Sequence, residues 1–252
     1  MKASKLVKTK TSAQVAALAL FGLACSQANA ALIRIGPGGF TPQASVITFS
    51  EPGYPTGTQN PVYTVATASL GTVTVSFGGY FAGQAVSAGF PVSLSDTTPT
   101  GPLSLDLSSS PSFISGDGAN PTSPVLSGTP QFNGPIAVLF STPVAAVGLD
   151  GGFFDAIGGT SIEAFGPDGS SLGLVHNTAT GIEFFGLADS GGGNVIQGIS
   201  FYITGNEPAG FGIDNLTFGS KQETTIVPET GNVAAVALLI GSGLVLRKRR
   251  RA

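Results

Sequence analysis

The stretch GTVTVSF, Gly71 to Phe77, alternates apolar and hydroxyl-bearing side chains. Val73, Val75 and Phe77 fall on one side of an extended chain and the intervening Thr and Ser residues on the other, because successive side chains of a strand point to opposite faces. The pattern predicts a β-strand with one buried face and one face toward solvent. Similar alternation recurs through residues 31–226, where helical periodicity is absent.

A Pro-Asp-Gly turn connects two further alternating segments. TSIEAF (160–165) and SSLGLV (170–175) flank GPDG (166–169), a pattern that predicts a β-hairpin. Short strands separated by turn residues predict an all-β domain, and we expect a β-sandwich of the jelly-roll type. Ser108 to Pro130 is predicted to be a long loop. The other predicted strands are Ser45–Phe49, Val62–Ala68, Phe90–Leu94, Leu103–Leu107, Ile136–Phe140, Val144–Leu149, Ile182–Phe185, Val195–Thr204 and Phe211–Phe218.

Charge is strongly segregated along the chain. The whole chain has a formal net charge of −3, but residues 31–226 contain thirteen acidic side chains and only two basic ones, Arg34 and Lys221, which gives this body a formal charge of −11. Such a body excludes electrostatic binding of nucleic acid or of anionic lipid. Its carboxylates form a solvated acidic surface or, where they cluster, attract a divalent cation such as Ca²⁺.

The N-terminus has the three parts of a secretory signal peptide. Lysines within the first ten residues precede an apolar segment from about Val15 to Ala24, and Ala28 and Ala30 supply the small residues of a signal-peptidase site. We therefore expect residues 1–30 to be removed by signal peptidase. The alternative is a lipoprotein signal in which Cys25, the only cysteine, is acylated. Cleavage after Ala30 leaves no thiol, so the exported protein must be stabilised by its core alone.

The C-terminus, residues 227–252, combines a polar motif, an apolar run from Val233 to Leu246 and five consecutive basic residues. As a helix the apolar run would be about 21 Å long, less than a hydrocarbon core of about 30 Å, and snorkelling by Arg247 extends its reach. The basic cluster is expected to stay cytoplasmic. We predict one short transmembrane helix with the body outside the inner membrane; the alternative is a buried helix with a basic tail.

This order of features resembles the PEP-CTERM family, which is named for its C-terminal sorting signal. The usual family motif is Val-Pro-Glu-Pro, and this chain has Thr in place of the second Pro. The resemblance implies that an exosortase, a membrane enzyme, removes the tail and releases or anchors the protein at the envelope of a Gram-negative bacterium that makes exopolysaccharide. With Gly231, the motif also resembles the Leu-Pro-x-Thr-Gly signal of sortase substrates; we favour the exosortase. The motif residues are Val227, Pro228, Glu229 and Thr230.

Two segments of the body also resemble those of many PEP-CTERM proteins: ITFSE (47–51), followed by a Gly-Thr pair and Tyr63, and FGIDNLTFG (211–219). Similar strand pairs frame carbohydrate-binding-type jelly rolls, in which the first and last strands are neighbours. The resemblance implies that Glu51 and Asp214 approach each other and hold a structural Ca²⁺, with backbone carbonyls as further ligands. The alternative is that each acid caps a turn or faces water.

The sequence contains no convincing catalytic constellation, and we do not expect an enzyme. His176 is the only histidine, and no nucleophile-elbow pattern surrounds a serine of the body. Asp150 and Asp155 could serve glycoside hydrolysis if their carboxyls were about 5–10 Å apart. Asp150, followed by Gly151, is more simply a turn residue.

Together these observations predict an exported protein of the cell surface or exopolysaccharide matrix, with a structural or adhesive role. The alternatives are a secreted carbohydrate-binding module and a carbohydrate-active enzyme. Polysaccharide is thus the expected ligand, and nucleic acid is not. Sugar sites commonly use aromatic platforms, but Trp is absent, and we interpret the aromatic clusters at 77–81, 151–154 and 183–185 as core.

Overall fold

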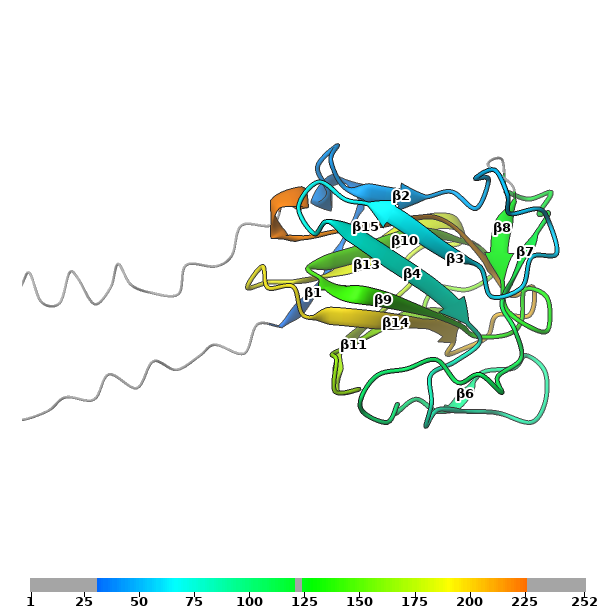
Figure 1. Cartoon of the computed structure of the whole chain (residues 1–252). Coiled ribbons are helices and arrows are strands. Elements are labelled where there is room, and N and C mark those ends of the chain that lie inside the picture. Colours follow the sequence, from blue (N-terminus) through cyan, green and yellow to red (C-terminus); the bar gives the residue numbers. More distant parts are fainter. Residues whose placement is uncertain (1–30, 121–123, 226–252) are drawn as a thin grey trace, which may run out of the picture.

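The computed structural model describes residues 31–120 and 124–225, and these form an all-β protein. Two antiparallel sheets face each other as a β-sandwich, and a small two-stranded sheet lies beside them (Figure 1). The first sheet contains β1 (Leu32–Ile35), β2 (Ser45–Ile47), β7 (Phe113–Ser115), β8 (Val125–Ser127), β10 (Ala146–Phe154), β13 (Gly181–Asp189) and β15 (Gly212–Gly219). The second contains β3 (Val62–Ala66), β4 (Thr72–Gly78), β9 (Ile136–Val144), β11 (Thr160–Phe165), β12 (Ser171–His176) and β14 (Ile196–Ile203), and the third contains β5 (Ala85–Val86) and β6 (Leu94–Asp96).

Strand order places the last strand near the middle of the first sheet. That sheet has the order β1-β13-β10-β15-β8-β7, and β2 also pairs with β15. Leu216 pairs with Ile47 of β2, and Ile213 pairs with Leu126 of β8, so β2 and β8 share one edge of β15. The second sheet has the order β12-β11-β14-β9-β4-β3. β11 and β12 form the predicted hairpin around the Pro-Asp-Gly turn.

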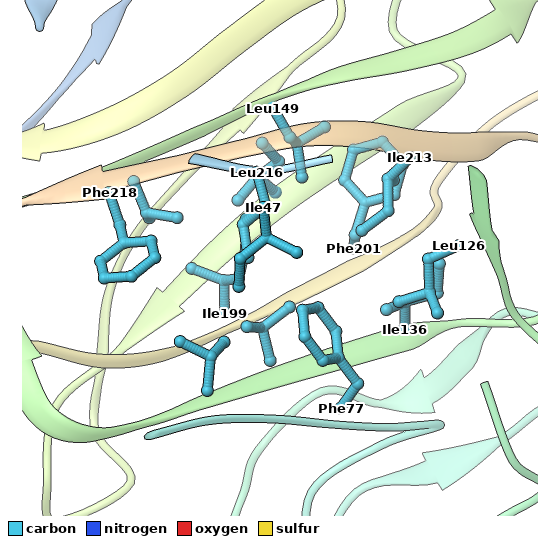
Figure 2. Packing of buried hydrophobic residues seen from close by; sticks show 14 of the residues in the cluster. Ile47, Phe77, Leu126, Ile136, Leu149, Ile199, Phe201, Ile213, Leu216 and Phe218 are labelled. Atoms are coloured by element: carbon cyan, nitrogen blue, oxygen red, sulfur yellow. The ribbon is translucent and has the colours of Figure 1, made fainter. Parts of the chain in front are cut away.

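The core lies between the two sheets. Val73, Val75 and Phe77 of β4 are at most 1% exposed, as their alternation predicted. Leu216 and Phe218 of β15 meet this layer from the facing sheet (Figure 2). Burial of each such side chain contributes about 1.5–3 kcal/mol. The sandwich is therefore held by apolar packing between its sheets.

Three local predictions were wrong. The strand expected at Phe90–Leu94 begins only at Leu94, as β6, and residues 103–107 form a single bridge between Phe81 and Leu105 instead of a strand. The predicted long loop, residues 108–130, contains β7 and β8. These two strands are only three residues long each, and β8 is held by pairing with β15, far away in the sequence.

The two ends of the described body lie at the same end of the sandwich. Ala31 accepts a hydrogen bond from the N–H of Ser190, and Phe40 forms an antiparallel bridge with Thr224. We call this the tail end; the start of β1 and the orange C-terminal segment mark it in Figure 1. The opposite end, which we call the far end, carries β6, β7 and β8 (Figure 1). Because β15 runs toward the tail end, its antiparallel neighbour β10 ends at the far end.

Candidate functional site

The predicted processing residues lie outside the part of the chain that the structure describes. These are Ala28 and Ala30 of the signal-peptidase site, Val227, Pro228, Glu229 and Thr230 of the sorting motif, and the predicted transmembrane segment. Among residues 31–120 and 124–225, no helix is long and apolar enough to cross a membrane.

Glu51 and Asp214 lie on neighbouring segments. β2, which precedes Glu51, pairs with β15, which contains Asp214. Glu51 Oε1 accepts hydrogen bonds from the N–H and the hydroxyl of Thr48, at 2.7 and 3.1 Å. Asp214 is fully buried, and its Oδ1 accepts a hydrogen bond of 2.7 Å from the N–H of Asn215. Both acids therefore also have the local partners expected of turn and strand residues.

One carboxylate oxygen in this region, Oε2 of Glu51, has the chemistry of a cation ligand. Glu51 Oε2 is buried without a hydrogen-bond partner, and so is the hydroxyl of Tyr63, although an unpaired buried polar atom costs free energy. Burial and the charge of Glu51 raise the pKa of Tyr63, so its hydroxyl stays protonated. The described residues contain no group of three or more His, Cys, Asp or Glu side chains placed to hold a metal. Calcium at Glu51 and Asp214 would need backbone carbonyls as its other ligands, and it stays a prediction.

Asp150 and Asp155 are held by different segments. The turn expected at Asp150 was wrong, because Asp150 lies inside β10, paired on both sides. It lies opposite Asp214 in the sheet, and its Oδ2 accepts a hydrogen bond of 2.7 Å from the side-chain amide of Asn215. Asp155 follows β10, and its Oδ2 accepts a hydrogen bond of 2.8 Å from the N–H of Ala209. Asp150 is thus tied to β15, and Asp155 is tied to the β14–β15 loop.

Asp155 also contacts Glu207, an acid that the sequence analysis did not single out. Glu207 is 1% exposed; its Oε1 accepts the N–H of Asp155 at 2.7 Å, and its Oε2 is buried without a partner. Burial raises the pKa of Glu207, the N–H groups of Asp155 and Ala156 oppose this rise, and the charge of Asp155 adds to it. The carboxyl fastens the β10–β11 loop to the β14–β15 loop at the far end.

His176 belongs to a chain of hydrogen bonds across the second sheet. Its Nδ1 lies 2.7 Å from the hydroxyl of Ser161, which lies 2.8 Å from the hydroxyl of Thr204. Ser161 is fully buried, whereas a nucleophilic serine must reach its substrate. The contact therefore acts as a structural bond between β11 and β12.

The aromatic clusters divide between core and surface. Four of their phenylalanines are buried, as the core interpretation predicted: Phe77, Phe81, Phe154 and Phe185. Tyr80 and Phe184 are only partly buried, and Phe153 is 52% exposed. Tyr80 follows β4 and Phe153 lies near the end of β10, both at the far end, whereas Phe184 lies in β13.

A hollow of about 320 Å³ opens at the far end beside Tyr80. Four separated segments line it, and none of the lining side chains is charged: Gly79, Tyr80, Val86, Ser87, Gly89, Val92, Ser108, Ser110, Thr129, Pro130 and Pro135. The lining combines hydroxyl groups with apolar surface. This volume and mixture are typical of a small-molecule site.

Hydrogen bonds between these segments fix the walls of the hollow. The Tyr80 carbonyl accepts the N–H of Asp106 at 3.0 Å, and Val92 donates its N–H to Asn133 at 3.1 Å. A Cβ on Gly79 would overlap the carbonyl oxygen of Ser110, so this glycine allows the two chains to touch. The hollow is therefore preformed by backbone contacts.

Comparisons with protein-family models, with curated proteins and with solved structures found no match.

Proposed function

We propose that this protein is an exported component of the cell surface or exopolysaccharide matrix, with a structural or adhesive role. In this proposal an exosortase-type enzyme processes the PEP-CTERM-like tail after signal peptidase has removed the leader. The support from the sequence is the signal-like N-terminus and the ordered motif, apolar run and basic cluster at the C-terminus. The body is proposed to be a jelly roll, which agrees with the pairing of β2 with the last strand.

The observation that carries this proposal is that both ends of the described body lie at the same end of the sandwich. Ala31 and Thr225, where the proposed leader and tail join the body, lie at the tail end through hydrogen bonds to Ser190 and Gly39. A tail held in the membrane would therefore point the far end away from the cell. Contacts with matrix would be made there.

In this proposal, exposed apolar side chains on far-end segments make the adhesive contacts. Isolated surface apolar residues are ordinary, but gathered ones mark interaction sites. Within the described part of the chain, the four most exposed large apolar side chains belong to far-end segments: Leu107 (98%), Phe90 (68%), Ile157 (68%) and Phe153 (52%).

A matrix-retention experiment tests this role. The full chain is expressed in an exopolysaccharide-producing host, and the protein is quantified in cells, washed matrix and medium. We expect it in the matrix, and we expect Phe90→Ser with Leu107→Ser to shift it into the medium. Val46→Ser is the matched control, because Val46 is 47% exposed but lies in β2, away from the far end. A wild-type protein confined to the cytoplasm, or found only in the medium, would contradict the proposal.

A carbohydrate-binding module is the second candidate function, and the uncharged far-end hollow favours it. An adhesive protein of the matrix and a glycan-binding module are compatible, since binding at this hollow would supply the adhesion.

A further inference from the structure

We propose that the far-end hollow binds a neutral saccharide, with Tyr80 as its aromatic wall; this inference rests on the matrix role proposed above. The lining of the hollow combines two kinds of surface. Five of the lining residues carry a hydroxyl group: Tyr80, Ser87, Ser108, Ser110 and Thr129. Valine, proline and glycine supply the rest of the surface.

That mixture selects an amphipathic ligand. A purely apolar molecule would take these polar groups out of water without offering them new hydrogen bonds, which costs free energy. A strongly polar one would gain nothing from the valines and prolines. A sugar ring has C–H faces for the apolar wall and hydroxyl groups for hydrogen bonds. It therefore matches both parts of the lining.

Charge favours a neutral sugar over an acidic one. No lining side chain is charged, so a carboxylate brought into the hollow would lose water without gaining a cationic partner. Asp106 lies beside the wall, where its carboxylate accepts hydrogen bonds from the N–H and hydroxyl of Ser108, at 2.8 and 2.6 Å. These bonds lower the pKa of Asp106, which stays ionised and repels an acidic sugar. The charge of −11 on residues 31–226 adds to this repulsion.

The wall segments also have limited freedom to collapse. The hydroxyl of Ser87 accepts a hydrogen bond of 3.1 Å from the N–H of Ser93, and the N–H of Ser87 donates one of 2.8 Å to the Ser93 carbonyl. These two bonds close the β5–β6 turn. Thr129 donates its hydroxyl to the carbonyl of Pro111. A preformed wall lowers the entropy lost on binding.

A second hollow lies on the other side of the β5–β6 turn. It has a volume of about 420 Å³, is more open, and includes Pro91, Ser93, Thr97 and Tyr202 in its lining, again without a charged side chain. Val92 lines the first hollow, and its neighbours Pro91 and Ser93 line the second.

The test measures binding of defined glycans to the full chain in detergent. The probes are fluorescently labelled neutral oligomers of glucose, galactose, mannose and N-acetylglucosamine, with oligogalacturonate as the acidic probe, followed by fluorescence anisotropy. We expect at least one neutral oligomer to bind saturably and oligogalacturonate not to bind. Tyr80→Ala should weaken binding at least about tenfold, because truncating a central aromatic contact removes much of the binding energy.

Three further variants keep the result interpretable. Val86→Trp places a large side chain at a partly exposed position in the lining, and it should weaken binding even if Tyr80→Ala fails to fold. Phe153→Ala is one control, since this exposed far-end aromatic lies outside this lining. It is not expected to change affinity at this hollow, but because Phe153 also belongs to the exposed far-end surface, Val46→Trp serves as the control that must leave affinity unchanged: Val46 is 47% exposed, lies in β2 and lies outside this lining.

The outcomes separate this inference from the matrix role. Neutral binding lost in Tyr80→Ala or Val86→Trp and kept in Val46→Trp supports the site. Neutral binding unchanged by both lining variants, binding of the acidic probe alone, or no binding at millimolar sugar would overturn it. Matrix retention without saccharide binding would leave the proposed function standing, whereas saccharide binding without matrix retention would overturn the proposed function.

Discussion

Phe40 and Thr224 face each other across an antiparallel bridge, which joins the first and last segments of the body at one end of the sandwich. The N–H of Thr41 donates to the carbonyl of Glu223, and Glu223 is itself buried, with its carboxylate accepting the N–H groups of Ser69 and Ser220. The last described residues before the proposed tail are therefore part of the packed fold. Cleavage beyond it should leave the body intact.

Arg34 and Glu183 form the only ion pair within the described residues, with 2.5 Å between Nη2 and Oε1. Burial opposes ionisation, but hydrogen bonds from Thr178 and Ala179, with Arg34, lower the pKa of Glu183. A lowered folded pKa stabilises the protein above the ordinary value of 4.5, and this stabilisation is lost as pH falls through the folded value. Glu183→Gln should therefore lower the free energy of unfolding at pH 7 by about 1 kcal/mol.

Urea unfolding at pH 7 and below pH 4 measures this difference. Asp96→Asn is the control, because Asp96 is exposed and has no cationic partner among the described side chains. A Glu183→Gln difference that stays constant down to the lowest pH would contradict the argument.

Gly159 should not accept a side chain. A Cβ there would lie 2.7 Å from Glu207 Oε2 and 3.1 Å from the carbonyl oxygen of Ala156. Such overpacking costs about 1–3 kcal/mol, so Gly159→Ala should lower the denaturation midpoint. Gly116→Ala, where no atom lies within 4 Å of the added Cβ, should change stability by less than about 0.5 kcal/mol. Equal effects of the two substitutions would contradict the packing argument.

Glu207 should make stability fall as pH rises. Burial raises its pKa above the ordinary value of 4.5, so the folded protein holds a proton that the unfolded chain releases. Stability then declines from the unfolded value up to the raised folded value. Glu207→Gln keeps an acceptor for the N–H of Asp155 but cannot ionise. Unfolding of both proteins across pH 4–8 should show the wild type losing stability relative to Glu207→Gln as pH rises; a pH-independent difference would contradict this.

Calcium should raise the melting midpoint if Glu51 and Asp214 hold a structural ion, because a ligand of the folded state alone stabilises it. The measurement compares thermal melting in calcium and in chelator. Glu51→Gln and Asp214→Asn should abolish the shift, while Asp168→Asn, in the exposed hairpin turn, should keep it. No shift in the wild type would remove the calcium prediction.

The sandwich could be predicted because its longer strands carry local signals. Alternation at Val73, Val75 and Phe77 and the turn at Gly166–Gly169 are properties of consecutive residues, and the structure confirmed both. β7 and β8 could not be predicted in this way. Each is three residues long, and β8 pairs with β15 through Leu126 and Ile213, which are distant in sequence.

The candidate sites depend even more on distant contacts. Asp155 and Glu207 are 52 residues apart and meet only because two far-end loops close on each other. The hollow beside Tyr80 is likewise built from four separated segments. Tyr80 lies in the aromatic cluster at 77–81, which the sequence led us to interpret as core. It is only partly buried because β4 ends at Gly78, before Tyr80.

The most direct test of the central claim is the mature C-terminus of the protein from its native host, determined by mass spectrometry. An exported matrix protein sorted by its tail should end between Val227 and Gly231, and the bond cut would distinguish exosortase-type from sortase-like processing. An intact Ala252 would show that the tail is kept, and it would contradict sorting by cleavage into the matrix.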